Sequence, residues 1–313
     1  MKQIGFEELE QIILGTSFLG SGGGGMTKTG YAFLNQLKTN FPALKLSLAD
    51  WNDPSLDPES LGMVICDIGA ISAIESNQSK AILAAFSALS DHQEKYTSKK
   101  TLAVIPIELG PESTLVPFVL AAYCPGIIVI DGDGARRAVP QIELSTYASN
   151  RLAVSPAVIT NDQGQSIIVN CDSPEMLDDM LRPIVEIENF GDSASLAMFS
   201  NSLADFGKAL IPGTISLSIA AGKMIQNLQK GLPTDPNTIK VVNGLEAELI
   251  GKGKVLNTVD NVGGGFDHGK TLIADPETMT LYTILNQNEN LIVYSSDQTA
   301  PLAVAPDLIC VIT

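Results

Sequence analysis

The sequence predicts an α/β protein in which an N-terminal, mainly parallel α/β domain is followed by a C-terminal, β-rich α+β domain. In the first half, short apolar runs typical of buried strands alternate with amphipathic helical patterns, which favours a mainly parallel sheet. After Pro140 the alternation ends, and from Lys252 onward only short strand-like runs remain, separated by turn residues. We therefore place a domain boundary near Asp172 and expect domains over 1–172 and 173–313.

The first half contains the predicted helices and buried strands of the α/β domain. Residues 6–19 have apolar side chains at helical spacing, including Leu9 and Ile12, after two early glutamates, which predicts an amphipathic helix. The run at 62–69 is apolar almost throughout, as expected for a strand that is buried on both faces. We expect further helices over 31–41, 75–90 and 115–123, and further strands over 44–48, 101–109 and 126–131.

The second half begins with a predicted hairpin, whose strands span 153–160 and 166–171 around an Asn-Asp-Gln-Gly turn. No repeat, low-complexity tract or long charged linker separates the halves, so we expect the two domains to pack together and their cleft to be the default ligand site. The remaining predicted elements are helices over 174–188 and 214–229 and antiparallel strands over 253–259, 270–274, 281–285, 291–295 and 308–312.

The charge balance of the chain is acidic. Its 35 Asp and Glu residues outnumber its 19 Lys and Arg residues and give a formal net charge of −16. Such a chain repels phosphate backbones and acidic membrane surfaces, so we expect neither nucleic acid nor membrane as a partner. The expected partner is a small molecule, and we expect the protein to form a homo-oligomer.

The sequence also favours a cytoplasmic location. Its most apolar stretch, 115–130, has 16 residues and two prolines, which is too short and too interrupted for a membrane span. The N-terminus lacks the basic region and long apolar core of a signal peptide. No pair of cysteines has metal-binding spacing, and we interpret all four as reduced, mostly buried side chains. They are Cys66, Cys124, Cys171 and Cys310.

A glycine run at 20–25 is the strongest local signal in the chain. Five glycines in six positions indicate a backbone with positive φ angles and exposed N–H groups. Because a helix follows, these groups could bind an anion or a carbonyl oxygen, although a tight corner between helices would also explain the run. The run matches no phosphate-binding motif, so we expect no nucleotide cofactor. The candidate binding residues are Gly22, Gly23, Gly24 and Gly25.

A second candidate site is the motif DGDGARR at residues 131–137. It follows a buried strand, at the sheet edge where open α/β proteins bind their ligands. Asp131 and Asp133 could hold a divalent cation, or one of them could activate a water molecule as a general base. Arg137 could bind an acidic group of a substrate. The alternative interpretation is a surface turn with a salt bridge.

Glu108 and His268 complete the set of candidate catalytic residues. Glu108 ends a predicted strand at the same sheet edge as Asp131, where a carboxylate is usually paired or functional. His268 is either a loop residue, a lone acid or base, or one ligand of a metal site. If one divalent metal is bound, its candidate ligands are Asp131, Asp133 and His268, because one histidine does not make a His-rich zinc site.

Six motifs spread over nearly the whole chain form a recognisable series. They are LGSGGGG at 19–25, IELGPEST at 107–114, DGDGARRAVPQ at 131–141, GGGFDHGK at 263–270, LNQNENL at 285–291 and APDLICV at 305–311. In this order they resemble a family found beside hydantoinases and oxoprolinases, one branch of which is named S-methyl thiohydantoin desulfurase. The resemblance implies hydrolytic action on a five-membered cyclic ureide, in which water replaces a methylthio group at the carbon between two ring nitrogens.

The resemblance also implies roles for the matching residues. Asp131 or Asp133 would activate the water directly or through a metal, and Arg137 would bind a substrate carboxylate. The N–H groups of Gly22–Gly25 would hold a ring carbonyl. Glu108 and His268 also match the motifs and are implied site residues.

The chain departs from the family pattern at four positions. The pattern has glycine, asparagine, glycine and glutamate where this chain has Pro111, Ser113, Arg136 and Gln141. If the glutamate at position 141 is an acid or base, its loss would change or remove turnover. Family members usually continue with further strands, so we expect a shorter C-terminal domain here. The alternative function is a non-catalytic subunit or small-ligand-binding partner of a hydantoinase- or oxoprolinase-type enzyme.

Overall fold

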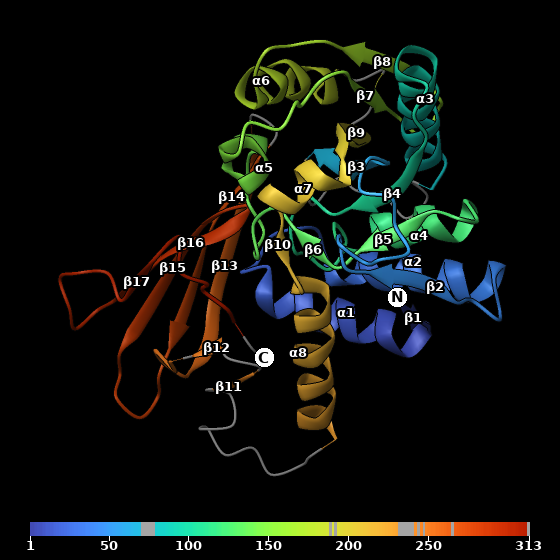
Figure 1. Ribbon diagram of the computed structural model, residues 1–313. Helices are drawn as coiled ribbons and strands as arrows, with labels where there is room; N and C mark the ends of the chain where they lie inside the picture. Colours follow the sequence, from blue (N-terminus) through green and yellow to red (C-terminus); the bar gives the residue numbers. More distant parts are fainter. Residues whose placement is uncertain are drawn as a thin grey trace.

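The protein folds around an eight-stranded sheet and a separate five-stranded sheet, shown in a computed structural model in Figure 1. Two short pairs of strands, β10 (Ile211–Pro212) with β6 (Gly132–Asp133) and β11 (Val241–Val242) with β12 (Leu245–Glu246), complete the described strands. The structure describes all residues except 70–78, 188–189, 191–192, 231–240, 243–244, 247, 264–265 and 312–313.

The eight-stranded sheet has the strand order β1-β2-β5-β4-β3-β9-β7-β8. Its central strands β2, β5, β4 and β3 run parallel, which confirms the predicted mainly parallel layer. Antiparallel strands flank them, with β1 at one edge and β9, β7 and β8 at the other. The bounds are β1 (Lys2–Ile4), β2 (Leu46–Ala49), β3 (Leu61–Gly69), β4 (Thr101–Ile105), β5 (Ile128–Ile130), β7 (Ala157–Thr160), β8 (Ser166–Val169) and β9 (Ser193–Ser202).

Helices bury both faces of this sheet. One apolar cluster joins the sheet to α1, α2, α3 and α4 through side chains such as Phe33 and Phe118. A second cluster joins the opposite face to α5, α6, α7 and a short 3-10 helix at Ile142–Leu144. The bounds are α1 (Phe6–Leu19), α2 (Thr27–Asn40), α3 (Ser79–Thr97), α4 (Val116–Tyr123), α5 (Thr146–Ser149), α6 (Pro174–Val185) and α7 (Leu203–Ala209).

Helix α8 (Thr214–Gln229) ties the second half of the chain to the first by packing closely on α1. A Cβ at Gly15 of α1 would overlap the backbone carbonyl of Ser218 on α8. A Cβ at Gly222 of α8 would likewise overlap the carbonyl of Gln11 on α1. Since β9 also comes from the second half, the predicted boundary near Asp172 falls between strands of one continuous sheet.

The five-stranded sheet is antiparallel and lies beside the main layer, with the strand order β13-β14-β15-β16-β17 (Figure 1). It confirms the predicted antiparallel, β-rich second region. Its buried apolar cluster is small and consists of Ile284, Val293 and Ile309. The bounds are β13 (Lys254–Gly263), β14 (Phe266–Ala274), β15 (Leu281–Gln287), β16 (Glu289–Ser295) and β17 (Ala303–Val304).

Some predicted elements differ from the structure. The strand predicted over 101–109 ends at Ile105, and the remaining residues form a connection to α4. The strand predicted over 308–312 is wrong for the described residues 308–311, which are irregular. There the backbone N–H of Ile309 donates to the Ser21 hydroxyl, which donates back to the Ile309 carbonyl, in place of a strand ladder. The start of the helix predicted over 75–90 lies outside the described residues.

All four cysteines are free thiols, as predicted. Cys66 is buried, whereas Cys124, Cys171 and Cys310 are only partly buried, so the expectation of mostly buried side chains was too strong. Across the described part of the chain, no helix is both long and apolar enough to cross a membrane.

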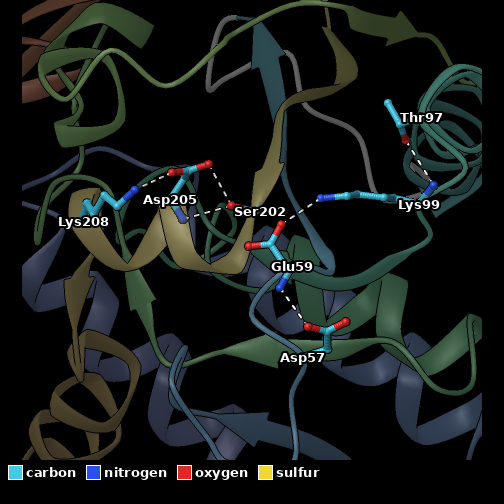
Figure 2. A network of polar contacts seen from close by, with 7 residues as sticks. All are labelled: Asp57, Glu59, Thr97, Lys99, Ser202, Asp205 and Lys208. Carbon is cyan, nitrogen blue, oxygen red and sulfur yellow. Dashed lines mark hydrogen bonds and ion pairs between the residues drawn. The ribbon is translucent and has the colours of Figure 1, made fainter.

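A chain of polar contacts fixes the periphery of the main layer, and Figure 2 shows its members. The Ser202 hydroxyl accepts the Asp205 backbone N–H at 3.1 Å and so caps α7. Lys208 pairs with the Asp205 carboxylate at 2.7 Å, and Lys99 pairs with Glu59 at 3.1 Å. Exposed pairs of this kind contribute ~0.2–1 kcal/mol each, so this network orders the surface and does not form a ligand site.

Candidate functional site

The candidate site is a cavity between the carboxyl ends of β3 and β4 and the turn that joins β15 to β16. Its volume is about 680 Å³, with open solvent at the mouth included. The position is the one where open α/β sheets bind their ligands. Its polar lining side chains are Asp67, Glu108, Glu112, Ser113, Gln141, Asp178, Arg182, Asn288 and Glu289.

Glu108 lies in the connection from β4 to α4, at the carboxyl end of a parallel strand. The Ser113 hydroxyl donates to one carboxyl oxygen at 2.7 Å, and the Val139 backbone N–H donates to the other at 2.6 Å. Burial nevertheless raises the pKa of Glu108 to about 7, because loss of hydration outweighs these two donors. Ser113, which stands where the family pattern has asparagine, thus orients this carboxyl.

Asp67 and Glu112 form a pair of neighbouring carboxyls on the wall of the cavity. The Ser195 hydroxyl on β9 donates to Asp67 Oδ1 at 2.6 Å. Among the described residues, no donor makes a well-formed hydrogen bond to Asp67 Oδ2 or to either carboxyl oxygen of Glu112, although the Met26 backbone N–H acts to lower the pKa of Glu112. The two groups therefore hydrogen bond through a proton that one of them carries. Burial raises the pKa of Asp67 to about 7, and burial with the adjacent Asp67 raises the pKa of Glu112 well above its ordinary value.

Glu289 reaches the cavity from the five-stranded sheet. It begins β16, and the preceding Asn288 adopts a positive φ of 55° in the tight turn after β15. Glu289 is 1% exposed, and burial together with the Glu108 carboxyl raises its pKa to about 9. Glu289 is therefore protonated at neutral pH and is a hydrogen-bond donor there.

The glycine run fits closely around the glutamates that line the cavity. A Cβ at Gly23 would overlap the carboxyl of Glu289, and a Cβ at Gly25 would overlap the side chain of Glu112. Gly24 and Gly25 have φ angles of 71° and 88° and line the cavity, whereas Gly22 packs against Asn290 outside it. The expected glycine lining is thus found for two of the four residues.

The backbone of Gly24 and Gly25, the two glycines that line the cavity, combines a hydrogen-bonded carbonyl with N–H groups for which no hydrogen bond is found among the described residues. The Gly24 carbonyl accepts the backbone N–H groups of Glu112 and Ser113, both at 3.1 Å, and so fixes the connection between β4 and α4. Within the part of the chain that the structure describes, the N–H groups of Gly24 and Gly25 have no acceptor. They remain available for a ligand oxygen, which is the predicted use of the run.

Arg182 is the one cation among the described lining residues of the cavity. Its guanidinium binds Asp178 through both carboxyl oxygens, at 2.8 and 3.2 Å, and donates to the Pro140 carbonyl at 2.6 Å. It also lies over the ring of Phe266 on β14, 3.9 Å from the ring centre. Arg182 therefore joins α6 to the five-stranded sheet and holds the two walls of the cavity together.

Asp131 lies at the predicted sheet edge but is not among the residues that line the cavity. One of its carboxyl oxygens accepts the backbone N–H groups of Ile215 and Ser216, each at 3.0 Å, and the other accepts the Ser216 hydroxyl. Asp131 thus caps the first turn of α8. Although Asp131 and Glu108 lie at the same edge of the sheet, as predicted, Asp131 binds this helix end and only Glu108 lines the cavity.

Asp133 and Arg137 are buried as well, so the surface salt bridge offered as the alternative is wrong. Asp133 accepts the backbone N–H groups of Ala135 and Arg136, at 2.9 and 2.7 Å, and burial raises its pKa to about 7. Arg137 donates to the backbone carbonyls of Ala138 and Pro306, at 2.9 and 2.8 Å. Neither side chain lines the cavity.

His268 lies on β14 with an exposed side chain and does not line the cavity. The candidate metal ligands Asp131, Asp133 and His268 do not form a metal site, because Asp131 caps α8, the N–H groups of a turn bind one oxygen of Asp133, and His268 lies exposed on β14. Within the described residues, no three His, Cys, Asp or Glu side chains are placed to hold a metal ion.

Sequence reasoning did not assign Asp67, Glu112 or Glu289 to the site. Asp67 interrupts the apolar run of β3, and a carboxylate near the end of a buried strand was the signal that could have singled it out. Glu112 follows Glu108 by four residues in the same motif. Glu289 is in a polar turn and carries no local signal of burial.

Two family models together match residues 7–313 of this chain. The model of the S-Me-THD-like N-terminal domain matches residues 7–171, and that of the S-Me-THD-like C-terminal domain matches residues 172–313. The chain therefore belongs to the S-Me-THD-like family, which is the S-methyl thiohydantoin desulfurase-like family that the motifs resemble.

The fold is similar to that of a protein from Chromobacterium violaceum whose crystal structure was determined in a structural genomics programme. The two share 28% sequence identity with a TM-score of 0.80, over 98% of this chain and 81% of that one. No curated protein matches the chain. These findings establish the family and the fold, and they do not identify the reaction.

Proposed function

We propose that this member of the S-Me-THD-like family hydrolyses an S-alkyl thiohydantoin, a five-membered cyclic ureide, in the cavity between β3, β4 and the β15–β16 turn. The observation that carries the proposal is the cluster of buried carboxyls, Glu108, Glu112 and Glu289, that lines one cavity, where burial raises their pKa values. Hydrolysis of such a ring needs one group that accepts a proton and another that donates one near neutral pH. Water attacks the ring carbon between the two nitrogens, the carbon–sulfur bond breaks, and a hydantoin and an alkyl thiol are formed.

Glu108 is the general base in this proposal. Its two donors, Ser113 and the Val139 N–H, fix the orientation of the carboxyl. Its pKa of about 7 makes it ionised above neutral pH while it is still basic enough to take a proton from water. This replaces Asp131 and Asp133 as the group that activates the water, because Asp131 caps α8 and neither aspartate lines the cavity.

Glu289 is the general acid. With a pKa of about 9 it is protonated where Glu108 is ionised, so the two carboxyls hold opposite protonation states between these values. Glu289 donates its proton to the leaving thiolate, and Glu108 holds the proton taken from water. Release of that proton and reprotonation of Glu289 restore the starting state.

The remaining lining groups bind the ring. The open N–H groups of Gly24 and Gly25 donate to a ring carbonyl and stabilise the negative charge that develops there. The Asp67–Glu112 pair accepts the ring N–H. Arg137, once considered for a substrate carboxylate, binds backbone carbonyls instead, so we expect substrates without a carboxylate at this position.

Thiol release from S-methyl thiohydantoins, followed with a colorimetric trap, tests the proposal. We expect Glu108→Gln to lower turnover by ~100-fold or more, the scale of a lost general base. We also expect the wild-type rate to be bell-shaped in pH, with limbs near 7 and 9, and Glu289→Gln to remove the upper limb. The matched control is Glu94→Gln, an exposed glutamate on α3. No release by wild type across a panel of thiohydantoins would reject the proposal.

A second candidate function, a non-catalytic ligand-binding partner of a hydantoinase-type enzyme, is favoured by one residue. Gln141 lines the cavity where the family pattern has a glutamate, so a carboxyl is missing from this wall. Under this alternative, wild type binds the ring without releasing thiol and co-purifies with a hydantoinase-type chain. Gln141→Glu distinguishes the two functions, because restored thiol release would identify the missing acid.

A further inference from the structure

Three side chains around the cavity carry carboxyl oxygens for which the described residues supply no well-placed N–H or hydroxyl donor, so that only protons held by the carboxyls themselves satisfy them. They are Asp67 Oδ2, both oxygens of Glu112, and Glu289 Oε2. Glu112 and Glu289 are each only 1% exposed, so solvent does not satisfy these atoms. A buried acceptor without a donor is unfavourable, and the wall is therefore complementary to a ligand that brings several donors of its own.

The ionisable groups around this cavity are mostly carboxyls with raised pKa values, and they become negatively charged as the pH rises through neutral. Arg182 is already paired with Asp178, and Arg137 lies nearby with its guanidinium on backbone carbonyls. The buried Asp133 and the Cys66 thiol are further titratable groups at its edge, both with raised pKa values. The carboxyls around the cavity, which outnumber these two cations, are Asp67, Glu108, Glu112, Asp178 and Glu289.

We propose that the cavity binds the N–C–N unit of its ligand as a planar amidinium or guanidinium cation, so that cyclic acylguanidines, the 2-iminohydantoins, are substrates alongside S-alkyl thiohydantoins. A guanidinium presents a flat fork of N–H donors that matches paired carboxyl oxygens, and it has no acceptor to clash with them. The binding claim stands on the cavity alone, whereas the substrate claim rests on the proposed function.

The reaction on this second substrate uses the same groups with a different leaving group. Water adds to the ring carbon that carries the exocyclic nitrogen, and Glu108 accepts the proton that the water loses. The bond from this carbon to the exocyclic nitrogen breaks, and Glu289 donates a proton to the departing amine. The products are a hydantoin and ammonia, and no oxidant, reductant or further reactant is needed.

Titration calorimetry with two rings of the same size tests the binding claim. The probes are 2-aminoimidazolinium, a cyclic guanidinium that stays charged, and imidazolidin-2-one, its neutral counterpart. We expect the cation to bind at least ~10-fold more tightly at pH 8, since charge-assisted hydrogen bonds are the stronger ones. Its affinity should rise between pH 6 and 9, by up to ~10-fold per unit, with protons released on binding as the carboxyls ionise. Equal or tighter binding of the neutral ring would overturn the inference.

Variants identify the carboxyls that hold the cation. Glu112→Gln and Glu289→Gln should each reduce the preference for the cation by ~10-fold or more and reduce the number of protons released. Glu94→Gln, with its side chain 52% exposed, should change neither. Thermal unfolding of each variant shows whether it remains folded, and a preference unchanged in both folded cavity variants would contradict the assignment.

Measurements of ammonia and thiol release separate this inference from the proposed function. Ammonia release from a 2-iminohydantoin together with thiol release from a thiohydantoin supports both. Thiol release with no preference for the cation keeps the proposed function and rejects this inference. Cation preference with neither product released rejects the proposed function and keeps the binding claim, and thiol release with cation preference but no ammonia rejects the substrate claim.

Discussion

The two sheets of this protein bury their side chains in different ways. The eight-stranded sheet lies between helices on both faces, and its central strands β3 and β4 are almost entirely buried. The five-stranded sheet has one small apolar cluster and leaves Leu285, Tyr294 and Val304 each more than a third exposed. Stability therefore resides mainly in the first sheet, since buried apolar area is the dominant stabilising term.

The cavity combines these two environments. Asp67 and Glu108 come from the rigid sheet, where strand ends fix their positions. Glu289 comes from the lightly buried sheet and is held in place by contact with Gly23 and the glycine run. The rigid half thus supplies a pre-organised wall, while the second half supplies one acid whose position depends on how the two halves meet.

Matched isoleucine truncations give the largest expected difference between the sheets. Ile65→Ala on β3, with a side chain 0% exposed, should lower the free energy of unfolding by ~3–5 kcal/mol, because helices and strands surround the vacated space. Ile284→Ala on β15 should cost ~2 kcal/mol or less, since its small cluster can relax. Urea unfolding measures both, and equal losses would show that the five-stranded sheet contributes as much as the first.

Much of this architecture follows from local sequence patterns. The helices over 6–19 and 214–229 and the buried strand near 62–69 have the period and composition of their final structures. Strand β9 was missed because SASLAMFSNS is rich in serine and alanine, which have little strand preference of their own. It becomes a strand because β3 and β7 pair with it on both sides.

The candidate site was predictable only in part. The rule that ligands bind at strand ends predicted the edge of the sheet where the cavity lies. It also brought Glu108 and two glycines into the predicted site. Asp131 lies at the same edge, but sequence could not reveal that α8 would use its oxygens. The contact between Glu289 and the glycine run joins opposite ends of the chain and leaves no local signal, because a polar turn looks the same whether exposed or buried.

A smaller, pH-dependent effect tests how strongly the two halves are coupled through the cavity. The folded pKa values, about 7 for Asp67 and Glu108 and about 9 for Glu289, lie above their unfolded values. Folding therefore favours the protonated forms. Their contribution to the free energy of unfolding is fully present below about pH 4. It is lost as pH rises through about 7 and then 9, so the unfolding free energy should fall by on the order of a few kcal/mol between pH 5 and 9.

Glu289→Gln isolates the share of this pH dependence that comes from the five-stranded sheet. A glutamine stays neutral, so the fall in unfolding free energy should become shallower on both sides of pH 7, and the fall that remains should lie mainly below pH 7, where Asp67 and Glu108 ionise. Denaturant unfolding at several pH values measures this, with Glu94→Gln as the control that keeps the wild-type slope. An unchanged slope above pH 7 in Glu289→Gln would mean that Glu289 is already ionised in the folded protein.

The smallest expected effect concerns His268, the remaining candidate from the sequence. It lies on an exposed position of β14, outside the cavity, so His268→Ala should change the unfolding free energy by no more than ~0.5 kcal/mol. Thiol release should stay within ~2-fold of wild type, because removing a group that does not touch the reacting atoms leaves the transition state unaffected.

Comparison of this variant with Glu289→Gln separates two uses of the five-stranded sheet. Both residues belong to that sheet, and their strands share the neighbour β15, yet only Glu289 lines the cavity. A large loss in Glu289→Gln with none in His268→Ala assigns the contribution of the sheet to its turn. A ~100-fold loss of thiol release in a well-folded His268→Ala variant would instead place the chemistry on the exposed face of the sheet. The cavity lined by carboxyls would then not be the active site.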